Sequence, residues 1–414
     1  MKSLQEFLQN FFKNKGQYVF FSLLIAKICG LISSIVVVRL LPQSDFGMMT
    51  IVASVFAVFA TFSGLGSSQG FLRFGAIAEQ AEEKEKLHQH FFLQGFLYQL
   101  ILSVLFIFSS IFFVQKYGDV LLIFIFFTIR LIGFYFFNHI QSYFRVYHDN
   151  KNFARVNNVV NVLGLILIII LTYFFGLKGY LLAISLAPFL SLFWFFKYKI
   201  LNFQRIKLQK KELWSYSFHA VFTAFLSDLL FSLDILLLGF LLNENAVADY
   251  KVAIILPSNL TFLAVSMLQA DFPKIAKNAH NQLFVKDYIS NYYKIFIPIC
   301  LVIFGVSFFF AKEILTLFFS SQYANETQVF LILVITFLMN MLFRNLFGNL
   351  LSAVGEMKKN TIISIFSLIV LAISAFILVP KFQILGMGIS VFLAMTFSGF
   401  LGMFFFWKYF KKLG

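Results

Sequence analysis

The chain has 414 residues, of which 60% are hydrophobic, 20% aromatic and only 12% charged. This composition excludes a soluble domain, because a soluble chain of this length needs far more charged surface. The 33 Lys and Arg residues outnumber the 18 Asp and Glu residues and give a formal net charge of +15. No basic stripe lies on a soluble segment, so we expect no nucleic-acid partner. We expect the excess charge to face the anionic lipids of the inner leaflet.

Long apolar runs recur along the whole chain, and most reach the roughly 20 residues that a helix needs to cross a bilayer. We predict twelve transmembrane helices, at residues 17–41, 46–70, 91–114, 119–144, 154–175, 178–198, 215–242, 247–270, 292–311, 327–352, 360–379 and 384–407. The predicted fold class is therefore an all-α polytopic membrane protein.

The connections between these runs alternate in charge. Of the 33 Lys and Arg residues, 24 lie in one set of connections or at the helix ends beside it, 6 in or beside the other set, and 3 deep inside the predicted helices. Cytoplasmic loops of membrane proteins carry an excess of Lys and Arg. The bias therefore predicts that both termini are cytoplasmic, which agrees with an even number of helices.

A long basic connection near the middle of the chain separates two sets of six predicted helices. The predicted parts are an N-terminal lobe, a cytoplasmic linker and a C-terminal lobe, at 1–201, 202–212 and 213–414. The two halves resemble each other weakly, since Asp45-Phe46 and Asp249-Tyr250 each put an acid and an aromatic residue at the start of a returning helix. Transporters often contain such repeats, with the substrate path at the repeat interface.

Three cations lie deep inside the predicted helices, away from their ends, namely Lys27, Arg130 and Arg344. An ionised side chain in lipid costs several kcal/mol unless it faces a polar interior or is paired. Any one of them could be the structural partner of a buried carboxylate, but three together favour one cationic cavity. The polar residues that we expect to line this cavity are Ser34, Asn161, Asn340 and Asn345.

Two carboxylates, Asp228 and Asp234, lie in the seventh predicted helix, and no cation lies near them in sequence. They must therefore face water, pair with distant cations or carry protons. We predict that one of them couples transport to H⁺ or Na⁺, and we expect no other cofactor. The sequence has no Walker A loop, HExxH, paired-Cys motif or GxSxG, so we predict no catalytic residue, no metal site and no enzymatic activity.

Several short motifs, in a fixed order along the chain, resemble those of one family. They are VRLLP at 38–42 with DFG at 45–47, SGLG at 63–66 with FLR at 71–73, LDILLLG at 233–239 with ADY at 248–250, LSAVGEMK at 351–358, and VPKFQILGMG at 379–388. In order and spacing they resemble the polysaccharide transporters, or O-antigen flippases, of the superfamily that also holds multidrug exporters and lipid II flippases. Gln383-Ile384 departs from the Tyr-Gly type of turn that is more usual there.

This resemblance implies a V-shaped, MATE-like pair of six-helix lobes around a central cavity. It also implies a substrate, an O-antigen, capsule or exopolysaccharide repeat unit on undecaprenyl pyrophosphate. Alternating access would move it from the inner to the outer leaflet of a bacterial inner membrane, with the glycan polymerase and export machinery as candidate partners. A cationic cavity suits this substrate, because arginine binds phosphate oxygens in pairs. Arg39 and Arg73, near the outer and inner mouths, complete the predicted substrate-binding set.

Two alternatives remain at this point. A cation-coupled multidrug exporter of the same fold would need a cavity dominated by carboxylates, because its cargo is cationic. A membrane glycan polymerase or glycosyltransferase would need a sizeable outer loop or an acidic cluster at a membrane face, and neither is evident in the sequence.

Overall fold

A computed structural model describes residues 16–197, 211–229, 232–278 and 281–411 of the chain. This described part is helical and contains no strand, which confirms the predicted all-α class. The chain divides into two compact units, one ending at Asp228 and the other beginning at Leu229. The predicted lobe boundaries at residues 201 and 213 stay a prediction.

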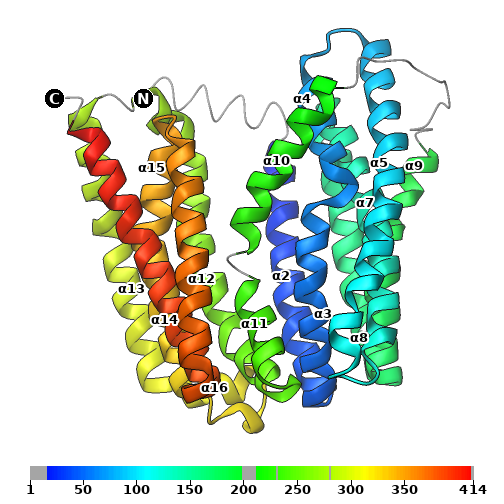
Figure 1. The fold of residues 1–414 in the computed structure, drawn as a ribbon. Coiled ribbons are helices and arrows are strands. Elements are labelled where there is room, and N and C mark those ends of the chain that lie inside the picture. The colour runs from blue at the N-terminus through cyan, green and yellow to red at the C-terminus, as the bar shows by residue number, and fades with distance from the viewer. Residues whose placement is uncertain (1–15, 198–210, 230–231, 279–280, 412–414) are drawn as a thin grey trace. The chain divides into compact units, whose positions relative to one another are not determined.

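The first unit is built around one central helix, α7, which contacts α3, α4, α5, α8 and the short helix η2 (Figure 1). Its elements are α2 (Gly16–Leu40), α3 (Gln43–Thr61), η1 (Ser63–Gly66), α4 (Ser67–Ile77), α5 (Ala81–Ser109), α6 (Ile111–Val114), α7 (Val120–Val146), α8 (Asn150–Leu186), η2 (Ala187–Ser191), α9 (Leu192–Lys197) and α10 (Lys211–Leu229). Large apolar side chains, among them Phe92, Tyr135 and Phe144, fill the space beside α7.

In the second unit α14 contacts α12, α13 and α16. The elements of this unit are α11 (Leu233–Leu241), α12 (Glu244–Lys277), α13 (Gln282–Phe318), η3 (Ser321–Tyr323), α14 (Thr327–Met339), the π-helical segment η4 (Asn340–Asn345), α15 (Leu346–Ala353) and α16 (Met357–Phe410).

The long helix α8 reverses direction at Gly176, where φ is +57° and ψ is −137°. Beyond this turn the chain runs back along itself. A Cβ at Gly179 would clash with the Leu171 carbonyl oxygen, and a Cβ at Gly164 would lie 3.1 Å from the Ala187 Cβ. The turn falls where the sequence predicts a connection between the helices at 154–175 and 178–198.

The long helix α16 reverses in the same way at Gln383, where φ is +51° and ψ is −130°. A Cβ at Gly386 would clash with the Leu378 carbonyl oxygen, and a Cβ at Gly402 would lie 3.8 Å from Ile363 Cδ1. The two halves of α16 therefore pack side by side, as the orange and red helices of Figure 1 do. This turn too falls at a predicted connection.

The structure contains nine helical runs in its described part that are long and apolar enough to cross a membrane, so the protein is polytopic. Within the seventh predicted helix, Ser232 lies in a turn and α11 begins at Leu233, while α10 is described as far as Leu229 and residues 230–231 lie outside the described part. The count of twelve transmembrane helices therefore stays a prediction.

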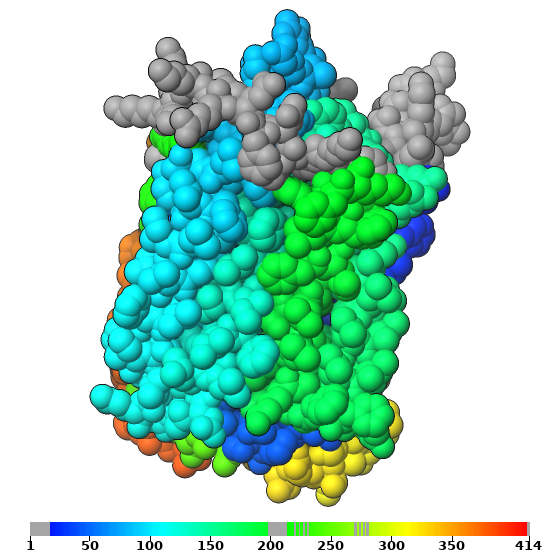
Figure 2. Space-filling view, turned by 90° about the vertical axis from the view of Figure 1, so that its right-hand side faces the viewer, coloured from blue at the N-terminus to red at the C-terminus, as the bar shows by residue number. Residues whose placement is uncertain are grey.

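One side of the first unit carries an apolar stripe suited to contact with lipid. Figure 2 shows this side, with α5 in cyan. The stripe consists of large exposed side chains of α5 and α6, including Leu97, Ile101, Val104, Phe108 and Phe112. Because a soluble protein rarely exposes so large an apolar area, this face is the one that we assign to the lipid.

The tight turn of α8 gives a first prediction. We expect Gly179→Ala to destabilise the protein by about 1–3 kcal/mol, because the added methyl group meets backbone that cannot move aside cheaply. Thermal unfolding of the purified protein in detergent, followed by size-exclusion chromatography, measures the effect. Gly118→Ala is the matched control, since a Cβ there would meet nothing within 4 Å. Equal midpoints for the two variants would contradict this description of the turn.

Candidate functional site

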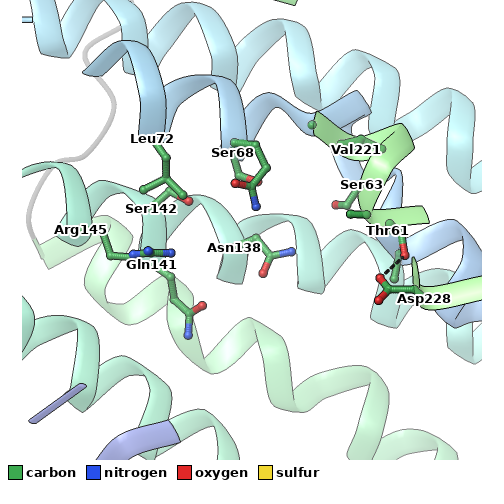
Figure 3. A pocket seen from close by; sticks show the side chains of 14 residues that line it. Thr61, Ser63, Ser68, Leu72, Asn138, Gln141, Ser142, Arg145, Val221 and Asp228 are labelled. Atoms are coloured by element: carbon green, nitrogen blue, oxygen red, sulfur yellow. Dashed lines mark hydrogen bonds between the residues drawn. The ribbon is translucent and has the colours of Figure 1, made fainter. Parts of the chain in front are cut away.

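A polar cavity of about 430 Å³ lies among α3, η1, α4, α7 and α10 of the first unit (Figure 3). We call it the α7 pocket. Its polar lining residues are Thr61, Ser63, Ser68, Gln69, Asn138, Gln141, Ser142, Arg145 and Asp228.

The helix α7 supplies one wall of this pocket. Asn138, Gln141, Ser142 and Arg145 lie at positions i, i+3, i+4 and i+7 and therefore on one helical face. The Gln141 amide donates to the Asn157 side-chain oxygen of α8 at 3.0 Å, which fixes its orientation. A helix that must cross lipid places such a polar face only where water or protein can meet it.

The opposite wall depends on the break between α3 and α4. Gly64, Leu65 and Gly66 are successive residues with φ values of +56°, +48° and +77°. Glycine adopts this left-handed conformation without steric cost, whereas Leu65 adopts it at a cost. The break turns the chain so that Thr61 and Ser63, before it, and Ser68, after it, all face the α7 pocket.

Two glycines of this segment allow α10 to pack closely against it. A Cβ at Gly66 would lie 2.6 Å from the Ser217 carbonyl oxygen, and a Cβ at Gly70 would clash with the Ser217 hydroxyl. This close approach holds the part of α10 that carries Val221 and Asp228 at the edge of the pocket.

Buried polar side chains support the break from behind. The Gln99 side-chain oxygen of α5 accepts hydrogen bonds from the Ser63 hydroxyl at 2.9 Å and from the Gly64 N–H at 3.0 Å. The hydroxyl of Ser67 lies 2.8 Å from Nε2 of the buried His139. A buried N–H is costly when left unpaired, so Gln99 stabilises a backbone conformation that the helix itself cannot satisfy.

The exposed carboxylate of Asp228 sits at one end of the pocket and Arg145 at the other, with Asn138 between them (Figure 3). The Thr61 hydroxyl lies 3.1 Å from an Asp228 oxygen and 3.0 Å from the Ala57 carbonyl oxygen. Because a hydroxyl has a single proton, it can donate to only one of these two acceptors at a time.

The lining combines several neutral amides and hydroxyls with one cation and one carboxylate. Amides and hydroxyls both donate and accept hydrogen bonds, as sugar hydroxyl groups do. Arg145 adds a charged donor for an anionic group, and Asp228 adds a charged acceptor. The pocket is therefore suited to a polar, many-hydroxyl headgroup.

A second cavity, of about 210 Å³, lies beside the predicted cation Arg130, and we call it the Arg130 pocket. Arg130 lies over the rings of Phe56 and Phe127, at 4.9 and 5.5 Å from their centroids. Such ring contacts stabilise a guanidinium by about 2 kcal/mol when water is excluded. The rest of this lining is mostly apolar, with Asn161 as a polar member.

The other residues predicted for the first unit lie outside these two cavities. Lys27 is exposed on α2, one turn from Gly30, which lines the Arg130 pocket. The Ser34 hydroxyl donates to the Gly30 carbonyl oxygen at 3.0 Å within its own helix. Arg39 lies exposed in the last turn of α2. The exposed Arg73 of α4 stacks on the Tyr216 ring of α10 at 4.5 Å.

The predicted pair of carboxylates is divided between the two units. Asp234 belongs to the second unit, is 2% exposed, and accepts hydrogen bonds from the Tyr250 hydroxyl and the Ile235 N–H, both at 2.8 Å. These contacts join the start of α11 to the start of α12. Asp228, in contrast, faces a cavity.

Arg344 lies in the π-helical segment of the second unit together with Asn340 and Asn345. Its guanidinium donates to the Ser398 hydroxyl of α16 at 2.8 Å. The Asn340 amide lies 3.9 Å from the Met395 sulfur atom, while the Asn340 side-chain oxygen and the Asn345 side-chain nitrogen have no hydrogen-bond partner among the described residues. π-Helical segments often occur at functional sites.

Some lining residues of the α7 pocket are absent from the predicted set. Thr61, Ser68 and Gln69 are missing because the sequence predicts one straight helix over 46–70 and therefore gives no sign of the turn at η1. Arg145 is missing because it looks like an ordinary cytoplasmic loop cation. The polar spacing of Asn138 and Gln141 is visible in the sequence and is the signal that could have found this wall.

Comparison with known proteins places the chain among polysaccharide biosynthesis proteins. A family model described as "Polysaccharide biosynthesis protein" matches residues 12–279. The capsular polysaccharide biosynthesis protein CapF of Staphylococcus aureus is 23% identical over 418 residues, covering 96% of this chain and 98% of that protein.

Solved structures show the same fold. The lipid II flippase MurJ in an inward closed conformation aligns with a TM-score of 0.76 at 17% identity, covering 96% of this chain and 89% of that one. An inward-facing multidrug resistance MATE family transporter of the MOP superfamily aligns with a TM-score of 0.69 at 18% identity, covering 94% and 95% of the two chains. At these identities the likeness establishes the fold alone, and it confirms the predicted MATE-like architecture.

The geometry of the α7 pocket predicts which positions meet water. In a variant with Cys29 and Cys300 replaced by Ala, we expect new cysteines at Gln69 and Asn138 to react with a membrane-impermeant maleimide. A cysteine at Ile140, which is 0% exposed, is the control. Because the thiolate is the reacting form and needs water around it, the pocket positions should react at least about tenfold faster. A rate at Asn138 no higher than at Ile140 would show that the pocket is closed to water.

Proposed function

The chain belongs to the polysaccharide biosynthesis protein family, and from that premise we propose that it is a flippase for a lipid-linked oligosaccharide. The observation that carries the proposal is the polar face of α7, where Asn138, Gln141 and Arg145 line a cavity inside an otherwise apolar unit. Sugar hydroxyl groups lose their hydration when they enter a membrane protein, and these side chains replace the lost hydrogen bonds.

The pyrophosphate of the substrate is assigned to Arg130. Arg130 and Gln141 are eleven residues apart on α7, which at 1.5 Å per residue puts them about 16 Å apart along the helix axis. They also lie on one helical face, because eleven residues complete about three turns. A substrate whose phosphates lie beside Arg130 therefore places sugars further along its glycan beside Asn138 and Gln141. The mostly apolar lining of the Arg130 pocket suits the neighbouring part of the lipid chain.

Ion coupling is assigned to Asp228 and its hydrogen bond with Thr61. An ionised Asp228 accepts the Thr61 proton, which then cannot bond to the Ala57 carbonyl oxygen. A protonated Asp228 donates to the Thr61 oxygen instead and leaves the Thr61 proton for Ala57. Proton binding thus changes both the charge of the pocket and a contact between α10 and α3. A bound Na⁺ would neutralise the same carboxylate.

The other predicted site residues keep supporting roles in this proposal. Arg344, with Asn340 and Asn345, is the candidate contact of the second unit with the anionic headgroup. Lys27 extends the cationic surface from α2, Arg39 attracts the headgroup at the outer mouth, and Arg73 attracts it at the inner mouth. Asp234 acts as a structural residue, because its oxygens already accept from Tyr250 and Ile235.

The proposed substrate is a repeat unit on undecaprenyl pyrophosphate, moved by alternating access from the inner to the outer leaflet of a bacterial inner membrane. Both termini are cytoplasmic in this proposal. Anionic inner-leaflet lipids contact the basic connections, and the polymerase or export machinery receives the product. The assignments are supported by the polysaccharide biosynthesis family to which the chain belongs and by its likeness in fold to a lipid II flippase.

A multidrug exporter is the second candidate, and the fold alone does not separate the two. The cavity charges favour the flippase, since Arg145 and Asp228 balance in the α7 pocket and Arg130 is the unbalanced charge that would repel a cationic drug in the other. Coulomb repulsion between like charges is strong where water is scarce.

The phosphate assignment predicts the effect of removing the cations. We expect Arg130→Gln and Arg344→Ala each to abolish surface glycan in cells while the protein stays folded and inserted in the membrane. Loss of one charged contact to phosphate costs about 1.5–3 kcal/mol, which corresponds to roughly a tenfold to hundredfold loss of transport. Arg155→Gln, at an exposed position of α8, is the control and should leave glycan unchanged. Normal glycan with Arg130→Gln would remove this residue from the site.

The coupling assignment has its own test. In proteoliposomes that carry the lipid-linked oligosaccharide, we expect flipping by the unsubstituted protein to rise when a proton or sodium gradient is imposed. Asp228→Asn should lose this response. Thr61→Val should weaken it, because this variant lacks the hydroxyl that forms a hydrogen bond with the Asp228 carboxylate. Asp287→Asn changes an exposed acid and serves as the control. A full gradient response in Asp228→Asn would rule out Asp228 as the coupling residue.

A further inference from the structure

The second unit has a polar cavity that the proposed transport mechanism does not use. It has a volume of about 420 Å³, and we call it the loop pocket. Three short connections form it: the α11–α12 connection, the segment between η3 and α14, and the turn inside α16. Its lining consists of Asn243, Asn245, Ala246, Asp249, Asn325, Glu326, Gln328, Val329, Phe382, Gln383, Ile384 and Leu385.

Local contacts hold these connections in place. The Asn243 side-chain oxygen accepts from the Ala246 N–H at 2.9 Å and caps α12. The buried bond between Tyr250 and Asp234 fixes the same connection to α11. Tyr323, at the base of the second connection, is 0% exposed. Gln383 holds the third connection in its sharp turn with a φ of +51°. The pocket is thus largely pre-formed, as ligand sites usually are.

The lining of the loop pocket differs in charge from the two cavities of the first unit. It contains two carboxylates, Asp249 and Glu326, and five side-chain amides, but no Lys or Arg. Phe382 adds an aromatic ring that is 51% exposed. Carboxylates accept strong hydrogen bonds from hydroxyl groups, amides both donate and accept, and an aromatic ring covers the apolar face of a sugar. An anionic group would be repelled here.

Glu326 is the member of this lining most available to a ligand. It lies at the start of α14, but its carboxylate does not cap that helix, and the side chain forms no hydrogen bond or ion pair with the described residues. Burial raises the pKa of the Glu326 carboxyl above its ordinary value, because the charged form loses hydration. A sugar hydroxyl that donates to this carboxylate would compensate for the lost water.

We propose that the loop pocket binds neutral sugar residues of the transported oligosaccharide after they emerge on the outer side of the membrane. The proposal rests on the proposed flippase function, since the three connections belong to the set with few basic residues, which is assigned to the outer side. The cavity volume falls within the range of about 300–1,000 Å³ that is common for small-ligand sites. The pocket would hold neutral sugar residues of the glycan after transport.

Binding of defined oligosaccharides to the full-length protein in nanodiscs tests this site. The probes are chitotetraose and maltotetraose, which are neutral, and tetragalacturonate, which is acidic; saturation-transfer NMR measures binding. We expect a neutral probe to bind and the acidic probe to bind roughly tenfold more weakly or worse, because losing or opposing one charged hydrogen bond has about that effect. Glu326→Gln and Phe382→Ala should each weaken binding of the neutral probe severalfold or more.

Glu313→Gln is the matched control, because it makes the same change at an exposed position of α13 outside the loop pocket. A protein with Asn138→Ala and Gln141→Ala, which alter the α7 pocket, should still bind the neutral probe. Loss of binding in that double variant, or unchanged affinity in Glu326→Gln, would overturn the inference and leave the flippase proposal standing. The inference would also be overturned if the loop pocket bound Ca²⁺, added as calcium chloride, and bound neither neutral oligosaccharide. Failure of the flippase proposal itself would instead show as transport that is unaffected by Arg130→Gln and Asp228→Asn.

Discussion

A polar side chain on a helix that crosses lipid has to meet water or a partner inside the protein, and this constraint organises the first unit. The helix α7 is mostly apolar, yet one of its faces carries Arg130, Gln141 and Arg145. The surrounding helices leave cavities along that face rather than closing on it. The exposed apolar stripe lies on other helices, such as α5. The positions of the polar cavities in this unit therefore follow from the positions of the polar residues on α7.

The packing that leaves the α7 pocket open depends on small residues and one backbone break. Gly66 and Gly70 bring α10 against α4, and the left-handed residues of η1 separate α3 from α4. Gln99 and His139 satisfy the polar groups that this break exposes. Since a helix cannot satisfy its own backbone at a break, such a feature persists only where neighbouring side chains support it. In this unit that support comes from α5 and α7.

Much of the architecture could be predicted from the sequence, because apolar length and loop charge are direct consequences of the bilayer. The turns at Gly176 and Gln383 fall where connections were expected. The start of a new helix at Leu233, after the turn at Ser232, was not foreseen, because the sequence there contains neither proline nor glycine. As a result, two carboxylates expected on one helix belong to different units and make different contacts.

Predicting the site was harder, because a cavity depends on how helices approach each other. Arg130, Asn161 and Asp228 line cavities and were all among the candidate residues. Thr61 and Gln69 share a pocket only because η1 bends the chain, and helical periodicity cannot anticipate that bend. Arg145 was grouped with the loop cations because charge counting does not distinguish a residue that turns toward a cavity from one that faces lipid headgroups.

The central claim is that the face of α7 between Arg130 and Arg145 receives the headgroup of a lipid-linked oligosaccharide. The most direct measurement is photo-crosslinking with a substrate that carries photoreactive groups along its glycan, followed by mass-spectrometric mapping of the modified residues. The account predicts crosslinks on α7 around Asn138 and Gln141 and on the neighbouring parts of α4 and α10. Crosslinks confined to the lipid-facing stripe of α5 and α6 would contradict it.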